Sequence, residues 1–392
     1  MLSHSPPLPL TVDYSDESGI TAGDEEVILL ALEHRHRIHY LCLVFSDMHR
    51  IVMAIDGEFP ILEFLIVEFL ATNSTAPVLP ETLQAPHLRH LMLNGFAFPI
   101  RPRLRPTVTG LVTLCLVIQH ETAYFQPNIL LQWISFIPQL ESLLFALAFP
   151  VFDHDVESHM PSDTTYITLP KLRVFEFYGV NAYLDAVVCR IKAPLLEKLY
   201  IKFSEHQLTF PFPVSRLPQF ANTTENLRFG DAVVSFEDDQ TDVLLLHPGA
   251  NTYQIWVMIE CCHLEQQVSA MAGICNGLCE VFSAVENLTL QREVHDPSSQ
   301  DRNDVDRIEW RRLLRSFSNV KTLSIKDGLV EDLSHCLRPE DGELPLEILP
   351  ELQVLKYSQQ SRGTDYGGAF NSLIVARRNA GRHVLVGRHV HP

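Results

Sequence analysis

The sequence predicts an α/β solenoid in which short parallel strands alternate with helices or loops. A short apolar pattern recurs along most of the chain, segments with helical spacing of apolar residues stand between its copies, and a proline often comes just before a copy. Each copy predicts a strand, and each helical segment predicts the return of the chain to the start of the next strand. The prolines mark the points where these returns end.

The recurring pattern is apolar-x-x-apolar-x-apolar, as in "LRHLML", where Leu88, Leu91 and Leu93 are the apolar positions. This spacing is too tight for an amphipathic helix and too irregular for a plain alternating strand. Copies begin at Ile38, Leu62, Leu88, Leu111, Leu140, Leu172, Leu196, Val285, Val320 and Leu352, with weaker copies at Thr224 and Tyr253. The copies number about 12, and their mean period of about 28 residues is near the upper end for leucine-rich repeats.

A single repeat of this kind cannot bury its own apolar side, so neighbouring repeats must stack. Stacking joins the strands into a parallel sheet over one continuous core. The three apolar positions of each copy point into that core, and the residues between them face the open side of the sheet. We therefore expect an irregular leucine-rich-repeat solenoid, a horseshoe with the sheet on its concave face and helices and loops on its convex face.

Helices are predicted between the strands, where apolar residues recur at helical spacing. The expected helical segments are 24–36, 128–138, 180–194, 265–285, 304–318 and 368–381. Asp24, Asn128 and Asp304 are the expected N-cap residues. The prolines that end a return before a strand are Pro60, Pro86, Pro138, Pro170, Pro194 and Pro350.

One array is expected to occupy almost the whole chain. Residues 1–35 are interpreted as an N-terminal capping segment, a strand plus a helix, and residues 36–392 as the leucine-rich-repeat array. Polar or acidic stretches near 236–250 and 293–306 are interpreted as insertions between repeats. The basic, His-rich segment 381–392 is expected to be a frayed terminus.

Composition and charge limit the classes of function. Hydrophobic residues make up 46% of the 392 residues, and the net charge is −18. We expect no nucleic-acid partner and no membrane partner, because both attract cationic surfaces. The sequence shows no apolar run of about 18 residues and no signal peptide, which predicts an intracellular protein in the cytoplasm, the nucleus or both. The eight cysteines are too sparse for a disulfide scaffold.

The His-rich and Cys-rich segments contain the candidate residues for catalytic or metal chemistry. The side chains considered are His34, His36 and His39 in one segment and Cys261, Cys262, His263, Cys275 and Cys279 in another. Their spacing matches no structural zinc pattern, and "DRNDVD" at 301–306 lacks the glycine of a calcium loop. We therefore expect no metal, no cofactor and no catalytic residue. The alternative is a hydrolase or metal-dependent enzyme that uses these segments.

The N-terminal part carries a family resemblance. "LSHSPPLPLTVDY" at 2–14, a helix, and "HRIHYLCLVF" at 36–45 resemble the segment that follows the F-box in fungal, basidiomycete-type F-box proteins with leucine-rich arrays. The resemblance implies the substrate-recognition array of a ubiquitin-ligase adaptor. The stretches "LPETL" at 79–83 and "LPEL" at 349–352 lie before repeat strands and are not followed by an F-box. We therefore expect this chain to lack the F-box, so a Skp-type adaptor is an expected partner only if an F-box lies upstream. A non-functional truncated family copy is a further alternative.

The residues between the apolar positions are the expected partner-binding residues. In the first half they are apolar and include Phe64, Ile66 and Met92. Either a loop or the N-terminal segment covers them, or they form an exposed patch that binds a protein partner such as a ubiquitination substrate. The expected polar binding residues of the second half are Lys198, Tyr200, Lys202, Asn287, Gln291, Thr322, Lys326 and Lys356. Their lysines are expected to form a stripe that recognises an acidic protein segment.

Overall fold

The chain forms two compact units, Met1–Leu196 and Glu197–Pro392. The computed structural model describes residues 8–15, 20–45, 49–70, 76–80, 82–97, 109–149, 166–204, 216–222, 224, 226–249, 252–293, 306–326, 328–339, 346–358 and 368–389. No helix in these ranges has the length and apolar character needed to cross a bilayer.

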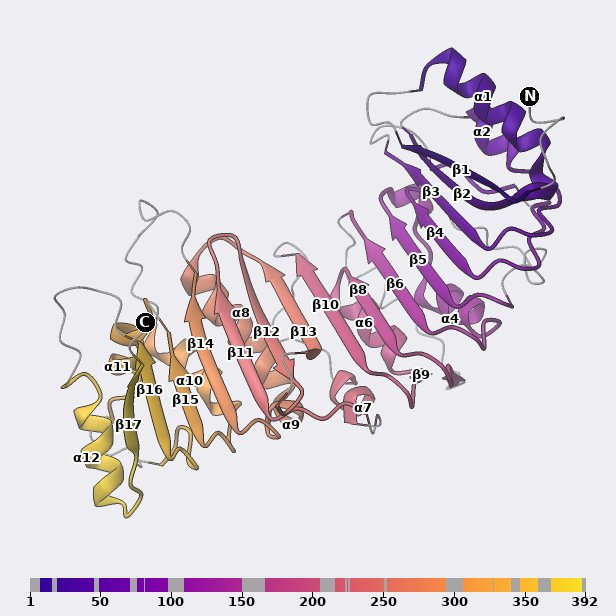
Figure 1. Cartoon of the computed structure of the whole chain (residues 1–392). Coiled ribbons are helices and arrows are strands. Elements are labelled where there is room, and N and C mark those ends of the chain that lie inside the picture. Colours follow the sequence, from indigo (N-terminus) through magenta and orange to yellow (C-terminus); the bar gives the residue numbers. More distant parts are fainter. Residues whose placement is uncertain are drawn as a thin grey trace. The chain divides into compact units, whose positions relative to one another are not determined.

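The first unit is built on parallel strands in chain order (Figure 1). These are β1 (Leu10–Ser15), β2 (Ile38–Phe45), β3 (Phe64–Phe69), β4 (His90–Asn94), β5 (Thr113–Ile118), β6 (Ser142–Leu147) and β8 (Val174–Tyr178). Its helices are α1 (Ala22–Glu33), α2 (His49–Ala54), α4 (Pro127–Ile134) and α6 (Asn181–Val188), with short 3-10 turns at Arg35–Arg37 and Glu121–Ala123. A small separate sheet pairs β7 (Ile167–Thr168) with β9 (Ile191–Lys192). Residues 1–35, predicted to be a capping segment, contain the strand β1 followed by the helix α1.

The register of the first sheet aligns the predicted apolar positions. Leu65 pairs with Leu91, Leu91 with Leu114, and Leu114 with Leu143. These leucines are buried, whereas the residues between them are partly exposed, so burial alternates along β3, β4 and β5. The expected parallel sheet with one buried face is confirmed for this unit.

A proline-containing turn precedes many of the strands. In "FPIL" at 59–62, the Leu62 amide donates to the Phe59 carbonyl at 3.3 Å, and Pro60 occupies the second position of the turn. The same bond recurs from Leu88 to Ala85 at 3.1 Å. Proline suits this position because its fixed φ matches a type I turn and the turn needs no N–H there. The turn places the first leucine of each pattern in the core just before its strand begins.

The second unit has a less regular sheet (Figure 1). The strand order is β10 (Lys198–Ser204), β13 (Tyr253–Glu260), β12 (Gln240–Leu246), β11 (Asp231–Phe236), β14 (Asn287–Arg292), β15 (Thr322–Ile325), β16 (Val354–Ser358) and β17 (Leu385–His389). The helices are α7 (Leu217–Asn222), α8 (Leu264–Gly277), α9 (Cys279–Phe282), α10 (Arg307–Arg315), α11 (Val330–Cys336) and α12 (Asn371–Asn379). Strand β12 runs antiparallel to both of its neighbours, and the other pairs are parallel. The protein is therefore an α/β protein with mostly parallel strands.

The structure of this unit differs from the sequence-based interpretation in two places. The segment near 236–250, predicted to be an insertion, contains β12, because the Glu237 amide bonds to the Gln240 carbonyl at 2.9 Å and turns the chain back into a hairpin. The weak copy at Thr224 forms no strand, and β11 begins at Asp231 instead. Only the ends of the segment near 293–306 lie within the described residues.

The ends of several elements also differ from the prediction. Thr21, not Asp24, caps α1, and its hydroxyl accepts from the Asp24 amide at 3.2 Å. Helix α4 begins with Pro127 rather than after an Asn128 cap, and Asp306 caps α10, whereas Asp304 lies outside the described residues. The C-terminal segment is not frayed throughout, because β17 pairs in parallel with β16. Backbone pairing to a neighbouring strand outweighs the polar composition of this segment.

Candidate functional site

The candidate site of the first unit is the sheet face opposite the buried leucines, here called the first open face. Its side chains form three rows across β1 to β6 and β8, because alternate residues of a strand point to the same side. The middle row is Asp13, Cys42, Ile66, Met92, Cys115, Leu144 and Glu176. The upper row lies toward the N-terminal ends of the strands and consists of Thr11, Tyr40, Phe64, His90, Thr113, Ser142 and Val174. The lower row lies toward their C-terminal ends and consists of Ser15, Val44, Glu68, Asn94, Val117, Ala146 and Tyr178.

The upper row contains three neighbouring rings, those of Tyr40, Phe64 and His90. The Tyr40 and Phe64 ring centroids lie 5.7 Å apart, and the Phe64 and His90 rings stack at 4.2 Å and 6°. His90 Nδ1 lies 3.1 Å from the Thr113 hydroxyl. Burial, and after it the nearby Arg89, lowers the pKa of His90. The neutral ring is therefore favoured, which suits a stacking and hydrogen-bonding role.

The middle row is apolar between two carboxylates. Burial raises the pKa of Cys42 to about 11, with a further contribution from Asp13, and it raises the pKa of Cys115 to about 11 together with Glu176 and Glu68. Both thiols are therefore protonated at neutral pH and behave as small apolar groups. The row presents thiol, aliphatic and thioether surface from Cys42 to Leu144.

The lower row adds hydrogen-bonding groups beside this apolar row. Asn94 Nδ2 donates to Glu68 Oε2 at 3.3 Å, and Gln119 Nε2 donates to Asn94 Oδ1 at 2.7 Å. Strand β1 pairs with β2 at the edge of the sheet, so residues 10–15 extend the sheet and do not cover it. Three predicted binding residues, Phe64, Ile66 and Met92, thus lie together on this face and are partly exposed.

The second open face is the corresponding face of the second unit, and it carries the predicted polar residues. Lys198 and Lys202 lie on β10, whereas Lys326 follows β15 and Lys356 lies on β16. Five strand-to-strand steps separate β10 from β15, which corresponds to about 24 Å. The lysines therefore form two separate pairs rather than one stripe.

Three of these lysines already interact with neighbouring side chains, which limits their ability to pair with an acidic segment of a partner. Lys198 Nζ lies over the Tyr253 ring, 5.3 Å from its centroid, and Lys202 Nζ lies 2.6 Å from Glu260 Oε1. Lys326 Nζ donates to Gln291 Oε1 at 2.9 Å. These contacts weaken the predicted preference for an acidic segment at this face.

A buried carboxylate lies between the two lysine pairs. Asp242 is 6% exposed, and its Oδ2 accepts from Trp256 Nε1 at 2.9 Å, while its Oδ1 has no hydrogen-bond partner among the described residues. The neighbouring Ser235 hydroxyl accepts from Gln291 Nε2 at 3.0 Å. Burial raises the pKa of Asp242 to about 6, although hydrogen bonds from Ser235 and Trp256 oppose the shift. Sequence reasoning missed this group because it assigned Asp242 to an insertion.

The raised pKa makes stability depend on pH through Asp242. The folded state holds this proton more tightly than the unfolded chain does, so the free energy of unfolding should fall as pH rises from about 4 to about 6. One pKa unit corresponds to about 1.4 kcal/mol, which gives a loss of up to about 3 kcal/mol. Asp242→Asn should remove this loss, as measured by urea unfolding at pH 4.5 and 7.5. The control is Asp239→Asn, at the exposed turn of the same hairpin, which should retain the wild-type difference in free energy of unfolding between the two pH values. If Asp242→Asn also retained this difference, Asp242 would not be the group responsible for it.

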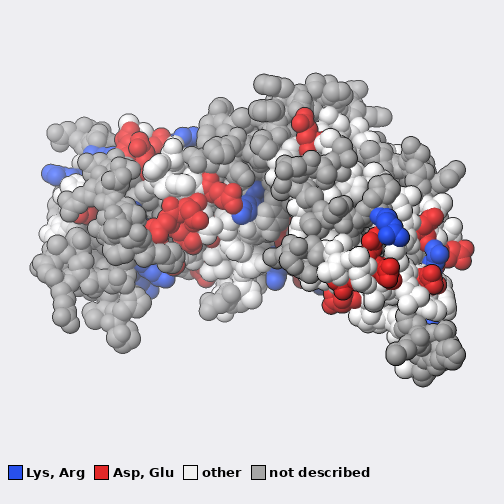
Figure 2. Space-filling model, turned by 90° about the horizontal axis from the view of Figure 1, so that it is seen from above, with Lys and Arg blue, Asp and Glu red and all other residues white. Residues whose placement is uncertain are grey.

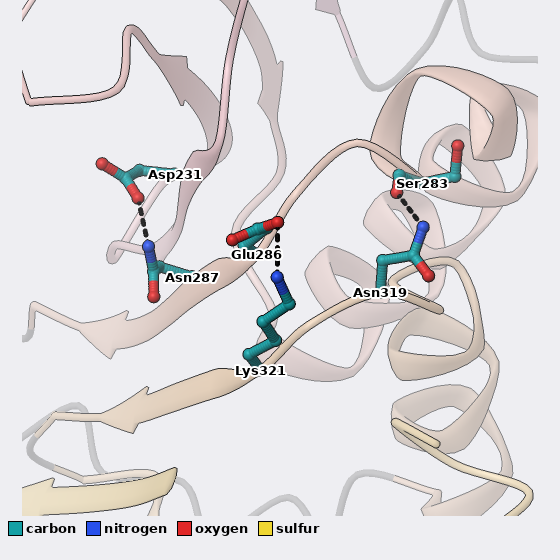
Figure 3. A network of polar contacts seen from close by, with 6 residues as sticks. All are labelled: Asp231, Ser283, Glu286, Asn287, Asn319 and Lys321. Carbon is teal, nitrogen blue, oxygen red and sulfur yellow. Dashed lines mark hydrogen bonds and ion pairs between the residues drawn. The ribbon is translucent and has the colours of Figure 1, made fainter. Parts of the chain in front are cut away.

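Polar side-chain contacts link the N-terminal ends of neighbouring strands in the second unit (Figure 3). Asn287 Nδ2 donates to Asp231 Oδ1 at 2.7 Å, Lys321 Nζ lies 2.6 Å from Glu286 Oε1, and Asn319 Nδ2 donates to the Ser283 carbonyl at 2.7 Å. The first contact joins the starts of β11 and β14, the second joins the residues just before β14 and β15, and the third joins the end of α9 to the turn before β15. The predicted binding residue Asn287 therefore has a structural contact that helps to set the register of the sheet.

The His-rich and Cys-rich segments are dispersed in the structure. The His34 and His36 rings lie edge to face at 6.2 Å, and His39 Nδ1 lies 3.0 Å from the Leu10 carbonyl oxygen. Cys275 is buried, which raises its pKa, whereas Cys279 is exposed at the start of α9. Within the described ranges, no three His, Cys, Asp or Glu side chains are grouped so that they could hold a metal ion.

The fold and the two open faces define an α/β protein whose units each carry a mostly parallel sheet with one side-chain face outside the core. No protein-family model matches the chain, and no curated protein matches it.

Proposed function

We propose that the chain is a protein-interaction scaffold, an irregular leucine-rich-repeat array that binds a protein segment on an open sheet face. The observation that carries this proposal is the middle row of the first open face, where Cys42, Ile66, Met92, Cys115 and Leu144 are in register and partly exposed. Contiguous apolar surface of this kind typically marks an interaction site. The parallel strands and buried leucines of both units support the repeat array.

The finer proposal is that this array recognises the substrates of an F-box-type ubiquitin ligase. It is supported by the resemblance of residues 2–14 and 36–45 to such proteins and by the order strand, helix, strand in residues 10–45. Binding of a Skp-type adaptor is proposed only for a chain that carries an F-box. Recovery of such an adaptor with a chain extended upstream of Met1 is the expected result if the extension encodes an F-box.

The scaffold proposal is tested by selecting binders from a random peptide library displayed on phage, with the full chain as the target. Enriched clones should bind at least tenfold more weakly to Ile66→Lys or Met92→Lys, because a lysine in the middle row would bring a charge onto the apolar contact surface. Val27→Lys is the matched control, since Val27 is exposed on α1 and lies outside the open face. Circular dichroism establishes that each variant is folded. A selection without enrichment, or clones that bind Ile66→Lys and Met92→Lys as well as the wild type, would refute the proposal.

A further inference from the structure

The charges on the first open face all have the same sign. The strands β1 to β6 and β8 contain no Lys or Arg, and the carboxylates of their open face are Asp13, Glu68 and Glu176. Within the described part of the chain, no Lys or Arg forms an ion pair with Asp13 or Glu176. The face is therefore apolar in its centre and uniformly acidic where it is charged.

The two end carboxylates lie at opposite ends of the apolar row. Asp13 lies on β1 at one end of the middle row, and Glu176 lies on β8 at the other. The six strand-to-strand steps between them correspond to about 29 Å. An extended peptide that crosses the strands advances about 3.3 Å per residue, so about nine residues cover this distance.

The field of these carboxylates reaches the apolar row. Asp13 contributes to the raised pKa of Cys42, and Glu176 and Glu68 contribute to that of Cys115, in both cases after burial. A cationic group placed beside the row would meet attraction from the same carboxylates, and an anionic group would meet repulsion. For the molecule as a whole, the net charge is −18, and on the side seen in Figure 2 the red patches of Asp and Glu are more extensive than the blue patches of Lys and Arg among the described residues.

The two flanking rows favour a peptide over a purely apolar ligand. Thr113 and Ser142 in the upper row and Asn94 in the lower row carry polar groups beside the apolar centre. An extended peptide has unpaired N–H and C=O groups along both edges, and these need partners when the peptide is bound. Polar side chains on both sides of an apolar row meet this requirement.

We propose that the first open face binds an extended apolar protein segment with a basic residue at each end, the two basic residues lying about nine positions apart. This inference rests on the proposed scaffold function and specifies its partner. Ile66, Met92 and Leu144 contact the apolar centre, and Asp13 and Glu176 pair with the two basic ends. The electrostatic contribution makes the complex sensitive to salt.

The test uses three fluorescent synthetic peptides of ten residues, so that the two end residues lie nine positions apart, and the full chain, with affinity measured by fluorescence polarisation. One peptide has Arg at both ends of an apolar centre, the second has Glu at both ends of the same centre, and the third has Arg at both ends of a Ser- and Asn-rich centre. The first should bind at least tenfold more tightly than either of the others, and its affinity should fall as salt is raised. Asp13→Lys combined with Glu176→Lys should reverse the preference between Arg and Glu ends.

Glu26→Lys combined with Glu33→Lys is the matched control, because it changes the net charge equally at exposed positions of α1. This control should keep the preference for Arg ends. If all three peptides bind equally or fail to bind, or if the control reverses the preference as well, the inference is wrong. The scaffold proposal fails separately, when the peptide library yields no clone that depends on Ile66 or Met92.

Discussion

Phe145→Ala is expected to lower the free energy of unfolding by about 4 kcal/mol, within the range for Phe-to-Ala changes in a core. Phe145 on β6 has 0% exposure, and its ring centroid lies 5.0 Å from that of Tyr183 and 5.7 Å from that of Phe125. The substitution removes the central ring of this cluster and leaves a cavity that the β6 backbone and α6 cannot fill. Urea unfolding followed by tryptophan fluorescence measures the loss.

The neighbouring residue provides the control for Phe145→Ala. Leu144 lies on the same strand but points to the first open face, where it is partly exposed. Leu144→Ala should cost less than about 1 kcal/mol, because the site is open and leaves no closed cavity. Equal losses for the two substitutions would contradict the assignment of β6 side chains to the two faces, and with it the binding face proposed above.

Arg377→Met is expected to destabilise the second unit by about 3 kcal/mol. Arg377 on α12 is fully buried, and its guanidinium donates to the carbonyls of Ile348 at 3.2 Å, Leu349 at 2.8 Å and Pro350 at 2.9 Å. Leu349 has a φ of 50°, in the left-handed region that is costly for a leucine. Methionine fills a similar volume but leaves the buried carbonyls of Ile348 and Leu349 and the partly buried carbonyl of Pro350 without these donors. Thermal and urea unfolding of the full chain measure the effect.

Arg378→Met serves as the comparison for Arg377→Met. Arg378 is adjacent on α12 and is exposed, so its loss should change the free energy of unfolding by less than about 0.5 kcal/mol. The difference between the two variants isolates the bonds that hold the turn before β16. If Arg377→Met proved as stable as Arg378→Met, the hydrogen bonds of the Arg377 guanidinium would not be what stabilises the packing of α12 against the turn before β16.

The two open faces differ in charge, and the proposals concern only the first. The first has an apolar centre with carboxylates at its ends and no basic residue in its strands. The second mixes lysines with carboxylates, and Lys202 pairs with Glu260 across adjacent strands. Only the first combines one sign of charge with a continuous apolar row, and we therefore place the proposed partner there.

The parallel strands could be predicted from the amino-acid sequence, because their signal is local. The spacing of Leu88, Leu91 and Leu93 predicts which side chains are buried, and the proline turn before a strand depends on only four residues. The same spacing predicts that Phe64, Ile66 and Met92 share the opposite face, since side-chain direction alternates along a strand. Local geometry is thus sufficient for the buried and open faces of the first unit.

The arrangement of the second unit could not be predicted from the sequence, because it depends on contacts between distant segments. Strand β12 stands between β11 and β13, and this placement separates the lysine pairs and buries Asp242. Strand order depends on long-range hydrogen bonds and packing, and neither is encoded in a short window of sequence. For the same reason Arg377 was not recognised as a core residue, because its partners are backbone carbonyls nearly 30 residues away. A charged side chain is buried where the fold supplies such partners, and only the assembled sheet and helices bring them together.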